Sequence, residues 1–323
     1  MNKSSARNEL CNYKFSKGES MNFILFTLYS CILILAFNQV DNYWFDLIAS
    51  LRGQLLAFSL LFAMACVHKA KKFGAVCVVF STVLIFHHYN YFNQADSQPG
   101  DIKIAQANVH YSNPYLTDII NTQLVNSDND ILILFEFNDT QRHLLSELKG
   151  RYHLFGYAEV EGAPFGIIVI SKHPIIQKQI KYLDNPKLGF VKLNFLFKDT
   201  VVSTILLHPP SPRNQLLWEQ RNYLLSQVDK QMLQLKGHWF IAGDFNTVPW
   251  SRYFLNHNNS CSQQGRNYAS WSAVENKLAI SLAGLPIDNC IVSQGTRLSG
   301  VHTQVIKGSD HHLLSYQLSF STY

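Results

Sequence analysis

The sequence predicts an α/β fold: a layered sheet domain covered by helices and preceded by transmembrane helices. Three observations support this prediction. The first hundred residues contain three long apolar segments. From residue 102 onward, short runs rich in Val and Ile alternate with polar segments, as expected of buried strands. One long amphipathic pattern, over 212–235, separates these runs, and such a mixture of strands and helices is typical of layered sheet proteins.

The three apolar segments cover residues 21–37, 47–67 and 73–86. The first is long enough for a span of roughly 17–25 residues. The second reaches that length by including Arg52 near one end, where its side chain can extend to the interface. The third needs the Tyr-containing extension to residue 92, and Tyr is favoured at the interface. We therefore expect about three transmembrane helices within residues 21–92. The alternatives are a cleaved signal peptide for the first segment and a buried helical hairpin for the other two.

The charged residues between these segments predict an orientation. A basic leader over 1–20 precedes the first segment, and Lys69, Lys71 and Lys72 separate the second from the third. The loop between the first two segments instead carries Asp41 and Asp46. By the positive-inside rule, the leader and the Lys-rich loop are cytoplasmic. Three spans then place the rest of the chain on the opposite side of the lipid bilayer, with residues 93–101 as a polar linker.

Residues 102–323 suffice for one globular domain with a large core. Residues 101–323 hold 19 Lys and Arg against 17 Asp and Glu, so this part is nearly neutral. Proteins that bind nucleic acid usually carry a basic patch, which weakens that interpretation without excluding it. Cys261 and Cys290 are the cysteines of the domain. A disulfide in an oxidising compartment and two buried thiols are both compatible with the sequence.

The expected strands are the apolar runs at 102–107, 131–137, 166–171, 190–197, 201–207, 239–242, 287–292 and 313–320. The clearest helix covers 212–235, where Leu217, Leu224, Val228, Met232 and Leu235 recur at helical spacing and form one face. Weaker helices are expected at 114–125 and 139–148.

Polar side chains close or flank most of these expected strands. They are restricted to acids, amides and imidazoles, namely Asn108, Glu136, His208, Asp244, Asn246, Asp288, Asp310 and His311. Taken singly, each has a structural interpretation as a turn former, a solvated strand end or a buried histidine. Their recurrence at strand ends, where sites are built, instead predicts one shared site.

The chemistry of this set favours hydrolysis of a phosphate ester. Carboxylate and amide oxygens are hard ligands that suit Mg²⁺. Histidine beside aspartate suits proton transfer. A metal and hydrogen-bond donors can offset charge on phosphoryl oxygens while a base activates water. The signatures of serine hydrolases, G-x-S-x-G, and of P-loop NTPases are missing.

The order of these motifs resembles the endonuclease/exonuclease/phosphatase superfamily, which includes DNase I. The similar blocks are NVHYSNP, ILILFE, PFGIIVIS, HPPSP, GDFNTVPWS, LPIDNCIVS and SDHH. They extend over residues 102–321 and are most similar to the bacterial membrane-anchored branch, which also carries N-terminal hydrophobic spans. The resemblance implies a four-layer sandwich of two mostly antiparallel sheets flanked by helices.

The resemblance also implies a metal site and a base. Glu136 is the expected main Mg²⁺ ligand, with Asn108 and Asp310 close to the metal and Mn²⁺ as a substitute. Asp288 and His311 would form the pair that activates the attacking water. Water would then displace the leaving group in line, without a covalent enzyme intermediate.

Three further residues complete the implied site. Asp244 would align or assist the water, Asn246 would hydrogen-bond the scissile phosphate, and His208 would donate to the phosphate or the leaving oxygen. On an extended chain, Asp244 and Asn246 would point to the same side, with Phe245 in the interior.

The implied function is a membrane-anchored, Mg²⁺-dependent phosphodiesterase or phosphomonoesterase on the extracytoplasmic side of a bacterial membrane. Its substrate would be a phospholipid, a small phosphoester or nucleic acid. A nuclease is the alternative function, and a catalytically inactive interaction module on the same fold is a third hypothesis. No protein partner is implied.

Overall fold

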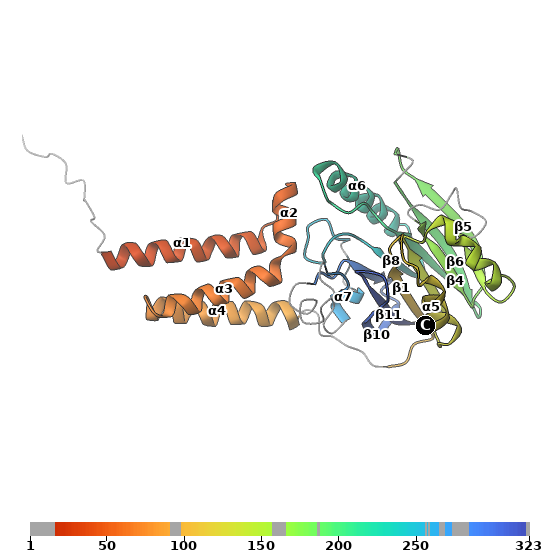
Figure 1. Cartoon of the computed structure of the whole chain (residues 1–323), viewed down its shortest axis with the longest axis horizontal. Helices are drawn as coiled ribbons and strands as arrows, with labels where there is room; N and C mark the ends of the chain where they lie inside the picture. The colour runs from red at the N-terminus through yellow and green to blue at the C-terminus, as the bar shows by residue number, and fades with distance from the viewer. Residues whose placement is uncertain are drawn as a thin grey trace, which may run out of the picture.

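The computed structural model describes residues 17–90, 98–156, 166–185, 188–255, 257, 259–264, 269–272 and 284–320. Most of the expected leader and linker therefore lies outside the described residues. Figure 1 shows a bundle of N-terminal helices beside a domain built from sheets and helices.

The N-terminal bundle consists of α1 (Lys17–Phe37), α2 (Tyr43–Ser50), α3 (Arg52–Val67) and α4 (Lys71–Asn90). Two windows, Ser20–Phe37 and Lys71–His88, are long and apolar enough to cross a membrane. The helices α2 and α3 pass the same test only as a pair, and they are bent by 69°. The second apolar segment is therefore two helices instead of one. In Figure 1, α2 stands at a steep angle at the domain-side ends of α1 and α3, next to the sheet domain.

Most apolar side chains of the bundle face outward. Only 11% of the window Ser20–Phe37 and 17% of the window Lys71–His88 are buried inside the structure. Large exposed side chains include Phe23, Ile34, Leu61, Val76 and Phe86. Apolar surface of this extent marks a membrane or protein interface. The arrangement does not fit the alternative in which the later segments form a hairpin buried inside the domain.

The domain contains two sheets, each mostly antiparallel with one parallel pair. The first has the strand order β10-β11-β1-β2-β4-β3 and the second β5-β6-β7-β8-β9. The parallel pairs are β1/β2 and β7/β8. The first sheet comprises β1 (Ile102–Asn108), β2 (Ile131–Phe135), β3 (His153–Phe155), β4 (Ile168–Ser171), β10 (Thr296–Val305) and β11 (His312–Phe320). The second comprises β5 (Ile175–Tyr182), β6 (Gly189–Phe197), β7 (Thr200–Leu207), β8 (His238–Asp244) and β9 (Asp288–Val292).

Three apolar cores hold four layers together. The central core lies between the two sheets and includes Phe135 from β2 and Phe240 from β8. A second core packs the first sheet against α5 (Leu116–Ile120) and its neighbouring turns. A third packs the second sheet against α6 (Gln215–Met232). Because both faces of each sheet are covered, most strands are apolar on both sides. The predicted four-layer sandwich is confirmed.

All eight expected strands are present, with ends shifted by one or two residues. The strands β3, β5 and β10 were not expected, because they lack a continuous apolar run; β5 is largely exposed. The expected helix at 212–235 is α6. The weaker helix at 114–125 is divided into α5 and a π-helical turn, η1 (Asn121–Val125), and the one at 139–148 is the 3-10 helix η2 (Asp139–Leu148).

The two cysteines of the domain are bonded to each other. Cys261 in the short helix α7 (Cys261–Gln264) and Cys290 in β9 form a disulfide. It ties the segment after β8 to the edge strand of the second sheet. Of the two alternatives compatible with the sequence, the disulfide is the one observed.

Candidate active site

Strand pairing brings the predicted site residues together at one edge of each sheet. In the first sheet, Asn108 ends β1 and Glu136 directly follows its parallel neighbour β2. In the second sheet, His208 follows β7, and Asp244 ends the parallel neighbour β8. Asp288 begins β9 as the antiparallel partner of Asp244. Because the carboxyl ends of parallel strands lie at the same edge, residues far apart in the sequence become neighbours.

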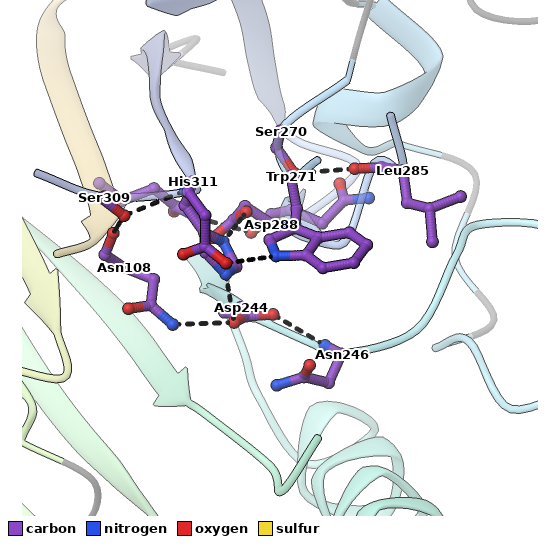
Figure 2. A network of polar contacts seen from close by, with 12 residues as sticks. Asn108, Asp244, Asn246, Ser270, Trp271, Leu285, Asp288, Ser309 and His311 are labelled. Atoms are coloured by element: carbon purple, nitrogen blue, oxygen red, sulfur yellow. Dashed lines mark hydrogen bonds and ion pairs between the residues drawn. The ribbon is translucent and has the colours of Figure 1, made fainter. Parts of the chain in front are cut away.

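Seven of the eight predicted residues line one cavity of about 1020 Å³, namely Asn108, Glu136, His208, Asp244, Asn246, Asp310 and His311. The eighth, Asp288, lies behind His311 and is fully buried. Figure 2 shows side chains from both sheets meeting in this network.

An Asp–His pair forms the buried side of the cavity. The Nδ1 atom of His311 lies 2.8 Å from Oδ2 of Asp288, and its Nε2 lies 3.7 Å from Oδ2 of Asp244. The backbone N–H of Asp288 donates to Oγ of Ser270, and that of His311 donates to Oγ of Ser309 (Figure 2). These contacts fix the orientation of the imidazole between two carboxylates.

The electrostatics of this pair favour a protonated imidazole. Burial alone lowers the pKa of His311, but the charges of Asp288 and Asp244 outweigh it and raise that pKa to about 10. Burial raises the pKa of Asp288, and the charge of Asp244 adds to the rise, with partial compensation by His311. Burial also acts to raise the pKa of Asp244, but His311 and His208 hold it below its ordinary value.

Asn108 connects the carboxylates of the two sheets. Its Nδ2 donates to Oε1 of Glu136 and to Oδ2 of Asp244, at 3.1 Å each. The Nε2 atom of His208 lies 3.6 Å and 3.4 Å from the same two oxygens. Glu136 has a backbone φ of 55°, in the left-handed region that is costly for a residue with a Cβ. This turn directs the chain away from β2 at the cavity.

The spacing of Asp244 and Asn246 has a different cause from the one expected. The strand ends at Asp244, and Asn246 adopts a φ of 49°, so the chain is not extended there. The N–H of Asn246 donates to Oδ1 of Asp244 (2.9 Å), which closes an Asx turn. Its Nδ2 donates to the carbonyl of Pro209 (3.0 Å). The prediction for Phe245 agrees with the structure, because this ring is fully buried in the core beneath α6.

Several residues around the site were missed by the sequence reasoning. The indole Nε1 of Trp271 donates to Oδ2 of Asp310 (2.8 Å), and Oγ of Ser309 donates to the carbonyl of Asn108 (2.7 Å). Ser309 could have been found from the sequence, since it lies beside Asp310 in the SDHH block. Trp271 and Ser270 could not, because their segment has neither a strand nor a helix pattern.

Arg221 was also missed. Its Nη1 donates to the carbonyl of Asn246 (2.9 Å), and its Nη2 lies 2.5 Å from Oδ2 of Asp46 in α2. Both side chains of this ion pair are buried. Arg221 could have been identified from the sequence, because position 221 lies on the apolar face of α6, four residues after Leu217 and three before Leu224. A charged residue on such a face needs a partner.

Helix α2 and its C-cap residue contribute to the cavity itself. Leu47 and Ser50 of α2 and the C-cap Leu51 line it together with the polar cluster. This contact could not be predicted from the sequence, because these residues belong to an apolar segment more than fifty residues before the domain.

The donor set is suitable for a divalent cation. Glu136, Asp244 and Asp310 line the same cavity and offer hard carboxylate oxygens. Asp244, Asp288 and His311 also have ligand atoms within 4.8 Å of one another. However, His311 is engaged by Asp288, and its raised pKa favours the protonated ring, which cannot ligate a metal. Glu136, with Asp310 and Asn108 close by, is therefore the better candidate for holding the cation.

Comparisons with known proteins agree with this architecture. A model of the Endonuclease/Exonuclease/phosphatase family matches residues 105–311. No curated protein matches the chain.

Similar solved structures include Staphylococcus aureus beta toxin, which is 18% identical with a TM-score of 0.50 and coverage of 67% of this chain and 99% of that one. A beta toxin variant from the same organism with bound magnesium ions is 18% identical, with a TM-score of 0.51 and coverage of 67% and 99%. The D. rerio TDP2 complex with a single-strand DNA product is 14% identical, with a TM-score of 0.54 and coverage of 68% and 98%. At these identities, the likeness shows the fold.

Proposed function

Because the chain belongs to the endonuclease/exonuclease/phosphatase family, we propose that it is a divalent-metal-dependent phosphoesterase. The observation that carries this proposal is the convergence of the predicted acids, amides and imidazoles on one cavity. Magnesium in the similar beta toxin variant and a DNA product in the similar TDP2 structure support a metal and a phosphoester for this chain as well.

Glu136 holds the cation in this proposal, with Asp310 beside the same cavity. Asn108 orients Glu136 and Asp244 through its two amide contacts. Trp271 keeps Asp310 in place through its indole N–H. When bound, Mg²⁺ or Mn²⁺ supplies positive charge that stabilises the developing charge on the phosphoryl oxygens.

His311 accepts the proton of the attacking water, and Asp288 stabilises the imidazolium that results. Asp244 lies 3.7 Å from the outer nitrogen of His311 and is placed to align that water. The charges of Asp288 and Asp244 raise the pKa of His311. A cation bound beside these carboxylates would neutralise part of their negative charge. The pKa of His311 would then be lower, which favours the neutral ring that can accept a proton.

Two residues are proposed to donate hydrogen bonds to the phosphate. Asn246 lines the cavity in its Asx turn, and its amide is the proposed donor to the scissile phosphate. His208 lies between Glu136 and Asp244, and it donates to the phosphate or to the leaving oxygen. The attack is in line, with water as the nucleophile.

We also propose that the enzyme is anchored in a membrane with its domain outside the cytoplasm. The windows Ser20–Phe37 and Lys71–His88, with α2 and α3 as a bent pair, support up to three spans. The Lys-rich turn between α3 and α4 supports a cytoplasmic location for that end of the bundle. The Cys261–Cys290 disulfide supports an oxidising compartment for the domain.

Metal withdrawal tests the catalytic proposal. The full chain, purified in nanodiscs, is expected to hydrolyse bis(p-nitrophenyl) phosphate when Mg²⁺ or Mn²⁺ is present. EDTA should abolish turnover, and excess Mg²⁺ should restore it, because the carboxylate cluster needs a cation to bind the phosphoryl group. Release of p-nitrophenolate measures the rate. Turnover that survives chelation would show that the metal assignment is wrong.

A further inference from the structure

The cavity has two kinds of lining. Besides the polar cluster, it is lined by Leu47 and Leu51 from the α2 region and by Leu217, Val248 and Leu285 from the domain. A phosphate with a small polar substituent would leave this apolar lining in contact with water. A ligand that fills the whole cavity therefore combines a phosphoester with an apolar chain.

The α2 wall is built into the domain. Asp46 accepts hydrogen bonds from Nε1 of Trp218 (3.0 Å) and Oγ of Ser251 (2.7 Å), in addition to its ion pair with Arg221. The indole Nε1 of Trp250 donates to the carbonyl of Ala49 (2.8 Å). These are buried or half-buried contacts, so α2 is packed as part of the domain.

The outer side of α2 is apolar and exposed. Trp44 is 67% exposed and Phe45 is 37% exposed, and α3 begins directly after Leu51. In Figure 1, α2 lies between the candidate spans and the sheet domain. Trp and Phe on an exposed helix beside membrane spans are typical of the bilayer interface. The cavity therefore has one wall at the level where lipid headgroups lie.

The charge of the cavity disfavours a nucleic acid. Among the described lining residues, Arg213 and Arg221 are the Lys or Arg side chains, and Arg221 is committed to the buried pair with Asp46. Binding of a nucleic-acid strand draws on several phosphate contacts from basic side chains. One remaining cation does not supply them.

We infer that the substrate is a membrane lipid with a phosphoester headgroup, which enters from the bilayer along α2 and places its apolar chain against Leu47 and Leu51. This inference rests on the proposed phosphoesterase function and specifies its substrate class. The headgroup reaches the polar cluster while the chain stays on the apolar lining, so the lipid does not have to leave the interface completely.

Chain-length dependence of binding tests the inference. The full chain in nanodiscs is titrated with ethyl phosphate and with dodecyl phosphate in Mg²⁺ by calorimetry, with empty nanodiscs as the blank. Wild type is expected to bind dodecyl phosphate at least about tenfold more tightly, because buried methylenes each contribute to affinity. Leu47→Asn and Leu51→Asn should each reduce this ratio at least about threefold. Leu233→Asn is the matched control, because Leu233, at the C-cap of α6, is 80% exposed and does not line the cavity.

Each outcome bears on one proposal. Partition of dodecyl phosphate into the nanodisc is the same for all variants, so a ratio unchanged by both wall substitutions would overturn the lipid inference. Tighter binding of a thymidine hexanucleotide than of dodecyl phosphate would overturn it in favour of a nucleic acid. Turnover of bis(p-nitrophenyl) phosphate is measured on the same samples. Its absence would contradict the phosphoesterase function, whereas the binding ratio tests the lipid chain independently of turnover.

Discussion

Single residues at strand ends account for most of the proposed chemistry. The acids, amides and imidazoles could be predicted as a group because they interrupt otherwise apolar runs. Their exact contacts could not, since Asn246 and Glu136 depend on positive φ angles that the sequence does not reveal.

Gly243 allows a close approach of two strands that the sequence does not reveal either. A Cβ there would come within 2.0 Å of the carbonyl oxygen of Leu207, so glycine lets β8 approach β7 and align Asp244 with His208.

Replacing His311 tests the proposed base. His311→Ala is expected to lower kcat by about 10²–10⁴-fold, because it removes the group that accepts the water proton. The melting temperature should fall as well, because the fully buried Asp288 loses its partner, so kcat is compared at a temperature below the unfolding transition of every variant. Steady-state kinetics and thermal unfolding of the full chain measure the two effects. His143→Ala is the control, because His143 is exposed on η2 and does not line the cavity. A near-wild-type rate for His311→Ala would assign the base to another group.

At the scale of elements, the apolar runs predicted eight strands, but they carried no prediction of which strands pair. Apolar runs mark buried strands regardless of which strands they pair with. The exposed strand β5 has no such run, and it was missed for that reason. The break between α2 and α3 was also missed, because the polar residues at 52–54 are compatible with the end of one span, where Arg52 extends to the interface. Contacts with the domain, more than 150 residues away in sequence, hold α2 at an angle to α3.

These contacts explain the segment TVPWS after β8. Ser251 binds Asp46 and Trp250 binds the carbonyl of Ala49, so the segment forms the docking surface for α2. Farther along, Arg252 donates to the carbonyl of Gln39 (2.8 Å). The sequence resemblance indicated that these residues are typical of the membrane-anchored branch. The structure supplies a physical reason, which is contact with the chain's own N-terminal helices.

The Asp46–Arg221 pair should be essential for this docking. Asp46→Asn is expected to destabilise the full chain by about 3–5 kcal/mol, because it leaves the buried guanidinium without its counter-ion. The turnover rate should fall as well, since Arg221 also holds the carbonyl of Asn246. Thermal unfolding in nanodiscs measures the stability change.

Two variants make the Asp46 test specific. Asp118→Asn, at an exposed position of α5, should leave the melting temperature unchanged. Replacing both partners, Asp46→Leu with Arg221→Met, should recover much of the lost stability, since no unpaired charge remains. Equal melting temperatures for Asp46→Asn and wild type would show that α2 does not depend on this pair.

For the whole molecule, the four-layer sandwich could be predicted because order and spacing of several motifs are specific to one family. The relation between the bundle and the domain could not. Periodicity describes a helix and its apolar face, but it does not say which surface covers that face. The structure places α2 against the domain, and the N-terminal helical bundle thereby becomes part of the candidate site (Figure 1).

Protease accessibility tests the proposed orientation. In spheroplasts of a bacterial host, externally added proteinase K is expected to digest the sheet domain, because three spans and the Lys-rich turn place it outside the cytoplasm. Immunoblotting against the domain measures its loss, and a cytoplasmic protein serves as the control for intact membranes. Protection of the domain until detergent is added would reverse the topology.

The central claim is that Glu136 and its neighbours form a metal-dependent hydrolytic site. The most direct test is the Mg²⁺ dependence of turnover for wild type, Glu136→Gln and the exposed control Glu147→Gln, all as full chains in nanodiscs. Glu136→Gln should raise the half-saturating Mg²⁺ concentration at least about tenfold, because an amide is a weaker ligand than a carboxylate. Glu147→Gln should match wild type. Identical Mg²⁺ curves for Glu136→Gln and wild type would contradict the account.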